Sequence, residues 1–120
     1  MANELTLDCV LKYLNGDYDI TKSETGLKVD VSGDNYICNV QNIGTSEEAL
    51  TLGDVSAGGF MFLQNLDATN YVEIRPAQGV ADLIKMKAGE PALFRLTGDA
   101  SPYAIANTAA CDLLVVLIPD

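Results

Sequence analysis

The feature that most constrains the fold is the stretch from Gly58 to Leu96, where short apolar runs alternate with turn residues. Short strands separated by Gly, Pro, Asn and Asp are typical of an antiparallel two-sheet sandwich. The stretch therefore predicts four strands joined by tight turns, over Gly59–Asn65, Asn70–Arg75, Val80–Met86 and Ala92–Thr97.

The first of these strands is apolar on both faces. Phe60 and Phe62 fall on one side with Leu66, whereas Met61 and Leu63 fall on the other. A strand of an antiparallel sheet usually leaves one face in water. Two apolar faces therefore indicate either a covered central strand or a face that meets another subunit. We expect Phe62 in the core and Met61 and Leu63 at a subunit contact.

The segments before this stretch also alternate. Residues 4–14 carry Leu, Cys and Tyr at every second position, which predicts a half-buried strand. The polar residues 17–26 predict a loop with a short edge strand. Residues 44–54 fit either one helical turn, through the capping-box spacing of Thr45 and Glu48, or a short strand. We favour the strand, because so short a helix would not be stable.

The apolar run from Asp112 to Ile118 is too short for a buried helix and predicts a central strand. About nine or ten short strands are expected in all. We predict an all-β protein with a single antiparallel β-sandwich domain over residues 1–120, either a jelly roll or a related two-sheet fold.

Composition excludes several function classes. Seventeen Asp and Glu against seven Lys and Arg give a net charge of -10, which disfavours nucleic acid and anionic membranes as partners. The chain has no His, which excludes Ser-His-Asp and Cys-His mechanisms and histidine-ligated metals. Neither GxxxxGK[ST] nor GxGxxG occurs. We therefore expect no enzyme activity, no cofactor and no metal.

The three cysteines, Cys9, Cys38 and Cys111, are widely spaced. Cys9 and Cys38 lie on apolar stripes, which predicts buried small side chains, although one disulfide stays open as an alternative. The N-terminal residues MANELTLD lack the basic start and apolar run of a signal peptide. No apolar run approaches the roughly 18 residues of a membrane span. We expect synthesis in a reducing cytoplasm.

Three acidic groups are weak candidates for a cation site. The turn from Asp30 to Asn35 places oxygen ligands at alternate positions, as Ca²⁺ prefers, but lacks the distal bidentate Glu. Glu47 and Glu48 are adjacent and would point to opposite faces of a strand. Asp17 and Asp19 share a face. In each case a solvated turn or loop is the favoured interpretation.

The basic residues of the second half of the chain alternate outward on neighbouring strands. They form either cross-strand pairs with Glu73, which is favoured, or a cationic patch for an acidic partner. The four concerned are Arg75, Lys85, Lys87 and Arg95. The partner interface predicted from the sequence comprises Met61, Leu63, Tyr71, Glu73, Arg75, Lys85 and Lys87.

One combination of motifs runs through QNIGTSEEALTLGDV, GGFMFLQNLDATNYVEI, LIKMKAGEPALFRLTG and YAIANTAACDLLVVLI. It joins a Gly-aromatic strand, an N-L-D-x-T-N-Y-V reversal, an A-G-E turn and an apolar last strand. In this combination roughly residues 37 to 118 resemble a group of small virion proteins of tailed bacteriophages, and the N-terminal segment lies outside the resemblance. The resemblance implies a jelly-roll protein that decorates or cements the capsid or sits in the tail, often as an oligomer.

Two functions follow as hypotheses. The first is a capsid decoration or cement protein of the virion, which binds the major capsid protein or another virion protein and forms a homo-oligomer such as a trimer. The doubly apolar strands Phe60–Leu66 and Leu113–Ile118 would supply its contact surfaces. The second is a tail or fibre module that recognises a host glycan or surface protein through its tyrosines and the turn from Asp30 to Asp34. An enzyme is the least favoured reading.

Overall fold

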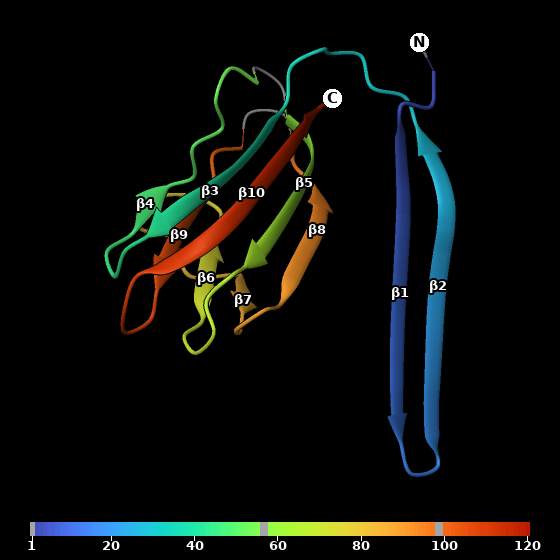
Figure 1. Ribbon diagram of the computed structural model, residues 1–120, viewed down its shortest axis with the longest axis horizontal. Helices are drawn as coiled ribbons and strands as arrows, with labels where there is room; N and C mark the ends of the chain where they lie inside the picture. Colours follow the sequence, from blue (N-terminus) through green and yellow to red (C-terminus); the bar gives the residue numbers. More distant parts are fainter. Residues whose placement is uncertain (1, 56–57, 98–99) are drawn as a thin grey trace. The chain divides into compact units, whose positions relative to one another are not determined.

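The computed structural model describes residues 2–55, 58–97 and 100–120, where every regular element is a β-strand (Figure 1). The predicted all-β class with antiparallel sheets is confirmed. The chain forms two compact units, Met1–Ser32 and Gly33–Asp120. The sequence predicted one sandwich over 1–120, whereas the two packed sheets lie within 33–120.

The first unit is one long hairpin of β1 (Leu5–Asn15) and β2 (Tyr18–Val29). Gly16 occupies the turn with a φ of 59°, which a residue without Cβ adopts at little cost. The strand predicted over residues 4–14 forms. Residues 17–26 were predicted as a loop with a short edge strand, and the loop is wrong, because the chain from Tyr18 onward is continuous strand in β2.

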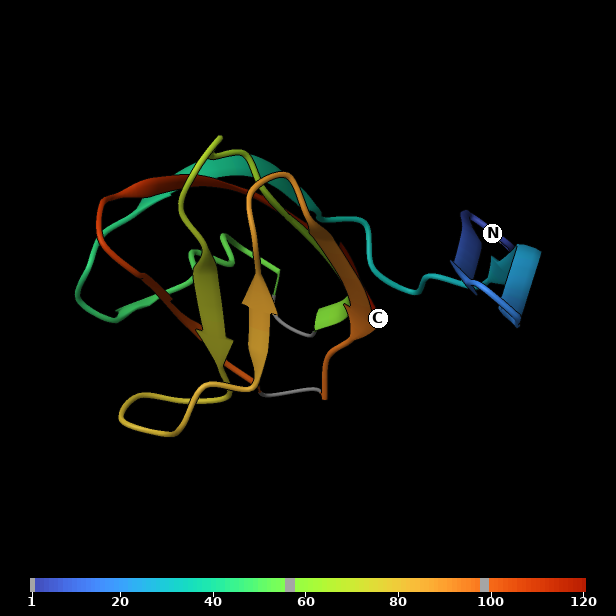
Figure 2. The same ribbon diagram turned by 90° about the horizontal axis from the view of Figure 1, so that it is seen from below.

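The second unit contains two four-stranded antiparallel sheets. The first has the order β3-β10-β5-β8 and the second the order β4-β9-β6-β7. Figure 2 shows the two layers, with the red strand β10 in one and the yellow strand β6 in the other. The strands are β3 (Ile37–Ile43), β4 (Glu48–Ala49), β5 (Gly58–Asn65), β6 (Val72–Arg75), β7 (Ile84–Met86), β8 (Pro91–Arg95), β9 (Tyr103–Ala106) and β10 (Cys111–Pro119).

The pairing of these strands is nested along the chain. Strand β6 pairs with β7, β5 with β8, β4 with β9 and β3 with β10. A single antiparallel ribbon with β6 and β7 at its tip is thus rolled up, and the pairs β5–β10 and β6–β9 join its turns into the two sheets. The central position predicted for the last strand is confirmed, since β10 lies between β3 and β5. The strand preferred over a helical turn in residues 44–54 is also confirmed, as the short β4.

The core lies between these two sheets. Alternate residues of β5 and β10 face it, and Met61, Leu63, Leu113 and Leu117 are all 0% exposed. From the second sheet come Val72, Ile74, Met86, Ala104 and Ala106. The prediction that Met61 and Leu63 lie at a subunit contact is therefore wrong. So is the predicted core position of Phe62, which is only half-buried because it lies on the outer face of its sheet.

The reversal between β5 and β6 is held by polar side chains. The Asn65 side chain is fully buried, and its Nδ2 donates to the carbonyl oxygens of Asn70 at 2.8 Å and Met86 at 3.1 Å. Its Oδ1 accepts from the N–H of Asp67 at 2.9 Å. Asp67 in turn accepts from the N–H groups of Thr69 and Asn70. The N-L-D-x-T-N part of the motif is therefore explained by the fold itself.

Candidate functional site

The hairpin of β1 and β2 has one mainly apolar face and one mainly polar face, although the polar face also carries Val10 and Leu14. Leu7 lies opposite Leu27, and Tyr13 lies opposite Ile20. The register shifts between Leu7 and Cys9, next to Gly26. This bulge lets odd-numbered residues at one end of β2 and even-numbered residues at the other reach the same face. The apolar residues of the hairpin apolar face are Leu5, Leu7, Cys9, Leu11, Tyr13, Tyr18, Ile20, Leu27 and Val29, and the same face also carries Lys22 opposite Leu11 and Glu24 opposite Cys9.

The bulge is held by a short hydrogen bond. Gly26 has a φ of 71°, and its N–H donates to Oδ1 of Asp8 at 2.6 Å. At the open end of the hairpin, the N–H of Val31 donates to the Glu4 carboxylate, and this bond lowers the pKa of Glu4. The shape of the ribbon is thus set by contacts within residues 4–31.

Among the described residues of the unit Met1–Ser32, no second layer covers the hairpin apolar face. Leu11 is 63% exposed and Tyr18 is 71% exposed, and none of the described residues of β1 and β2 is buried. The half-buried state predicted for residues 4–14 is therefore wrong, although the predicted alternation is present. A lone two-stranded hairpin is at best marginally stable in water. An apolar face of this length is expected to function in contact with another surface.

The sandwich carries a second apolar surface, on the outside of the sheet β3-β10-β5-β8. Its middle row runs across all four strands, because Val116 lies opposite both Cys38 and Phe62, and Phe62 lies opposite Leu93. Val40 at one edge is 56% exposed and Leu93 at the other is 37% exposed. We call this surface the outer apolar face. Its apolar residues are Cys38, Val40, Phe60, Phe62, Leu93, Leu114, Val116 and Ile118, and the polar Gln64 and Arg95 lie among them.

The outside of the other sheet is polar and holds most of the predicted interface. Glu73 lies opposite Lys85, and the Lys85 ammonium sits 4.1 Å from the centre of the Tyr71 ring. The structure thus brings Tyr71, Glu73 and Lys85 together. Lys87 follows β7, and its N–H donates to the Glu90 carboxylate.

Arg75 forms ion pairs within the chain. Its guanidinium contacts Asp82 at 2.8 Å and Glu47 at 2.7 Å, and these bonds raise its pKa. The Gly79 N–H and then Arg75 hold the pKa of Glu47 below its usual value. Arg95 lies on the other sheet, where it pairs with Asp120 and stacks on Phe60 at 4.5 Å. The alternative of one cationic patch formed by all four basic residues is therefore wrong.

Two of the three acidic candidates also have local partners. Asp30 accepts from the Asn3 N–H at 2.7 Å. Glu48 accepts from Gln41 and from the Gly44 N–H, away from the partners of Glu47. In residues 2–55, 58–97 and 100–120, no group of three or more His, Cys, Asp or Glu could hold a metal ion.

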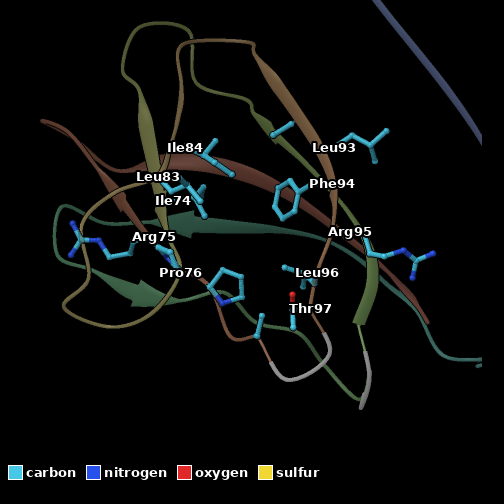
Figure 3. Close-up of a pocket in the computed structure, with 13 residues that line it drawn as sticks. Ile74, Arg75, Pro76, Leu83, Ile84, Leu93, Phe94, Arg95, Leu96 and Thr97 are labelled. Carbon is cyan, nitrogen blue, oxygen red and sulfur yellow. The ribbon is translucent and has the colours of Figure 1, made fainter. Parts of the chain in front are cut away.

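A cavity of about 630 Å³ opens between the edge strands β7 and β8 (Figure 3). Phe94 points into it toward Ile84, whereas Leu93 and Arg95 point away. Leu83 lies at its margin and is 75% exposed. The lining is almost entirely apolar, so the cavity offers little to orient a polar substrate. Gly98, the last residue of the resembling segment LIKMKAGEPALFRLTG, is adjacent in sequence and lies outside the described residues.

The three cysteines are free thiols. Cys9 and Cys38 are exposed, which contradicts their predicted burial, and each lies on one of the two apolar surfaces. Cys111 is buried, and burial raises the pKa of its thiol. The two exposed thiols are thus separate chemical reporters for the two surfaces.

The seven residues of the predicted interface lie on neither apolar surface, although the first hypothesis assigned contacts to the strands Phe60–Leu66 and Leu113–Ile118. The two doubly apolar strands are β5 and β10, which pair with each other and carry most of the outer apolar face. The hairpin apolar face was treated as half-buried, because alternation alone does not show whether a covering layer exists.

No protein-family model, curated protein or solved structure matches the chain. Among the described residues there is also no helix of the length and apolar character needed to cross a membrane.

Proposed function

We propose that this protein is a structural component of a tailed-bacteriophage virion, a decoration or cement protein that binds across neighbouring capsomers and stabilises the head. Its partner is the major capsid protein or another virion protein. The resemblance of residues 37–118 supplies the virion context. The hairpin of β1 and β2 supplies the means of attachment.

The observation that carries the proposal is the exposed hairpin apolar face. A chain that folded to act alone would gain by covering these side chains, at about 1.5–3 kcal/mol for each fully buried aliphatic residue. Both outer edges of the hairpin also lack a neighbouring strand among the described residues. Such an arm can bury its apolar face on a shell protein and extend one of that protein's sheets.

We also propose that the sandwich is a jelly roll. Support comes from the nested pairing of eight strands and from the orders β3-β10-β5-β8 and β4-β9-β6-β7, which a rolled antiparallel ribbon generates. Viral shells use this architecture repeatedly. The fold alone does not carry the function, because the same architecture serves many roles.

The direct test is binding of the purified chain to phage shells from which it has been stripped. Co-sedimentation is measured from low to high salt. We expect binding that high salt does not abolish, because apolar burial is not screened as surface ion pairs are. Failure to bind at any salt concentration would remove the decoration role.

A matched pair of variants tests the hairpin as the attachment site. Leu11→Asp places a charge on the hairpin apolar face, and Thr21→Asp places one on the opposite face, where Thr21 lies across from Lys12. We expect at least about a tenfold loss of shell affinity for Leu11→Asp. Thr21→Asp should bind like the unmodified chain. Equal losses would mean that the apolar face is not the contact.

A further inference from the structure

We propose that the hairpin adds to a sheet of the shell protein through the outer edge of β1, and that the outer edge of β2 is protected from strand addition. This inference rests on the proposed function, because it names how the same arm meets its partner. The partner element is an unpaired edge strand of the shell protein, with apolar side chains on the side that continues the hairpin apolar face. Backbone hydrogen bonds then give affinity, and the apolar side chains set the register.

The tight turn of the hairpin determines which backbone groups point outward. Asn15 lies opposite Tyr18 across a two-residue loop, and such a closing pair exchanges both of its backbone hydrogen bonds. Along an antiparallel ribbon, bonded pairs then alternate with pairs whose N–H and C=O groups face away from each other. We call the outward-facing positions of β1 the β1 edge, and they are Val10, Lys12 and Leu14. The β2 edge, on the other side of the ribbon, consists of Asp19, Thr21 and Ser23.

The strand β2 carries two features by which sheets resist the addition of a further strand. The first is the bulge, since Thr25 and Gly26 of β2 lie where β1 has only Asp8. A bulge bends its own strand and disrupts the ladder, which leaves a poor match to a straight neighbour. The second is composition, because every position of the β2 edge is polar and one of them is Asp, a residue depleted in strands.

The strand β1 has neither feature. From Cys9 to Asn15 it pairs residue by residue without a shift, and Leu5–Asn15 contains no Gly or Pro. Two of the three positions of the β1 edge are apolar and open to solvent, with Val10 56% and Leu14 77% exposed. A long, straight and apolar edge of this kind is a template for pairing with another chain. The hairpin is therefore adapted to accept a strand on the β1 side only.

Hydrogen exchange tests the edge directly on the intact, unmodified chain. Exchange is followed with residue resolution by mass spectrometry, for the free chain and for the chain bound to stripped shells. We expect the amides of the β1 edge to exchange at least about tenfold more slowly in the bound chain, because each N–H gains a carbonyl acceptor. The amides of the β2 edge should exchange as in the free chain.

Two patterns of exchange would overturn the proposal. Bound chain in which the β2 edge is protected, or in which neither edge is protected, would mean that the contact is not made through β1. Protection of the β1 edge in the free chain at the same concentration would mean that this edge is already paired without the shell protein.

A matched pair of proline variants tests the same hydrogen bonds by affinity. Val10→Pro and Ser23→Pro each remove one outward N–H from facing positions of the two edges, where the hairpin itself does not use it. Val10→Pro also keeps an uncharged apolar side chain. In co-sedimentation with shells, we expect Val10→Pro to bind at least about tenfold more weakly, since a carbonyl of the partner loses its donor. Ser23→Pro should bind within about twofold of the unmodified chain.

The outcomes separate this inference from the proposed function. Normal binding by Val10→Pro together with impaired binding by Leu11→Asp would remove the β1 edge and leave the hairpin as the attachment site. Absence of any shell binding by the unmodified chain would remove both. Equal losses for Val10→Pro and Ser23→Pro would contradict the assignment of the contact to one edge, and the exchange experiment decides independently because it needs no variant.

Discussion

The hairpin and the sandwich each contain a long strand with apolar residues at every second position, and these residues are exposed in one and buried in the other. In β10, alternate residues Leu113, Val115 and Leu117 are at most 1% exposed. In β1, the alternate residues Leu11 and Tyr13 are at least half exposed. Both strands are long and antiparallel and have an apolar face, and β10 is apolar on its outer face as well. The difference is that β10 faces a second sheet from the same unit, whereas the described residues 2–32 around β1 form two strands and no second layer.

This comparison separates two meanings of an alternating pattern. Alternation decides which side chains share a face, because successive residues of a strand point to opposite sides. It does not supply the layer that covers this face. In the sandwich the chain provides both layers, and burial stabilises the fold. In the hairpin the apolar residues share a face but stay exposed, so they are available for binding another surface.

The largest difference is expected from one substitution made in both units. Leu63→Ala removes a fully buried side chain between the sheets and should lower the free energy of unfolding by about 3–4 kcal/mol. Leu11→Ala removes an exposed side chain and should change the free energy of unfolding by less than about 0.5 kcal/mol. Urea unfolding of the two variants measures both values. Similar losses would mean that the hairpin is packed in solution, and the comparison would fail.

A smaller effect is expected at the buried amide of Asn65. Asn65→Ala leaves the carbonyls of Asn70 and Met86 and the Asp67 N–H without their partner, at a cost of about 2–3 kcal/mol. Asn42→Ala is the control, because exposed Asn42 makes one hydrogen bond to Asp112 and should lose less than about 0.5 kcal/mol. Thermal unfolding of both variants provides the readout. A stable Asn65→Ala protein would contradict the structural role given to the reversal motif.

Two glycines with the same backbone conformation sharpen the contrast further. Gly53 in the sandwich and Gly16 in the hairpin have φ values of 60° and 59°. A Cβ on Gly53 would lie 2.5 Å from Ile37 Cγ2, whereas one on Gly16 would meet nothing within 4 Å. Gly53→Ala should therefore cost the sandwich about 1–2 kcal/mol through strain and crowding.

Gly16→Ala carries the same backbone strain but lies in the other unit. It should leave the cooperative unfolding of the sandwich unchanged, as followed by denaturant titration. A loss of sandwich stability in Gly16→Ala would show that the two units unfold together. That result would weaken the distinction on which the comparison depends.

The fold class and most strands of the sandwich could be predicted from the sequence, since turn residues divide the chain at regular intervals. The orientation of β5 could not. Phe60 and Phe62 on one face and Met61 and Leu63 on the other are equally apolar, so composition does not decide which face enters the core. In the structure the face with Met61 and Leu63 enters the core, next to Leu117 and Val115 of the neighbouring strand β10.

The candidate site was predictable only in part. Tyr71, Glu73 and Lys85 do share an outer face, because they lie on consecutive segments joined by a local hairpin. The outer apolar face depends on the pairing of β3 with β10 and of β5 with β8. The registers of these pairs are set by tertiary packing, which the sequence pattern does not show. The length of the strand β2 was missed for another reason, since only a short edge strand was predicted within residues 17–26. Its polar residues suit a loop, and the turn at Gly16 and the bulge at Gly26 carry the pairing.

The smallest expected effect is a loss of sandwich stability at low pH. Hydrogen bonds from the Gly79 N–H and from Arg75 lower the pKa of Glu47, and those from the N–H groups of Asn70 and Thr69 lower that of Asp67. A carboxyl whose pKa is lower in the folded state stabilises the fold above its unfolded pKa. That contribution is lost as the pH falls through the folded pKa.

We therefore expect the melting temperature of the sandwich to fall progressively below about pH 4.5, the ordinary pKa of a glutamate. Glu47→Gln cannot ionise, so its melting temperature should be lower than that of the unmodified chain at pH 7, and the difference should shrink toward pH 3. Calorimetry across this range measures the difference. A gap that stayed constant with pH would show that Glu47 acts through packing alone, because only a titrating group changes its contribution as protons bind.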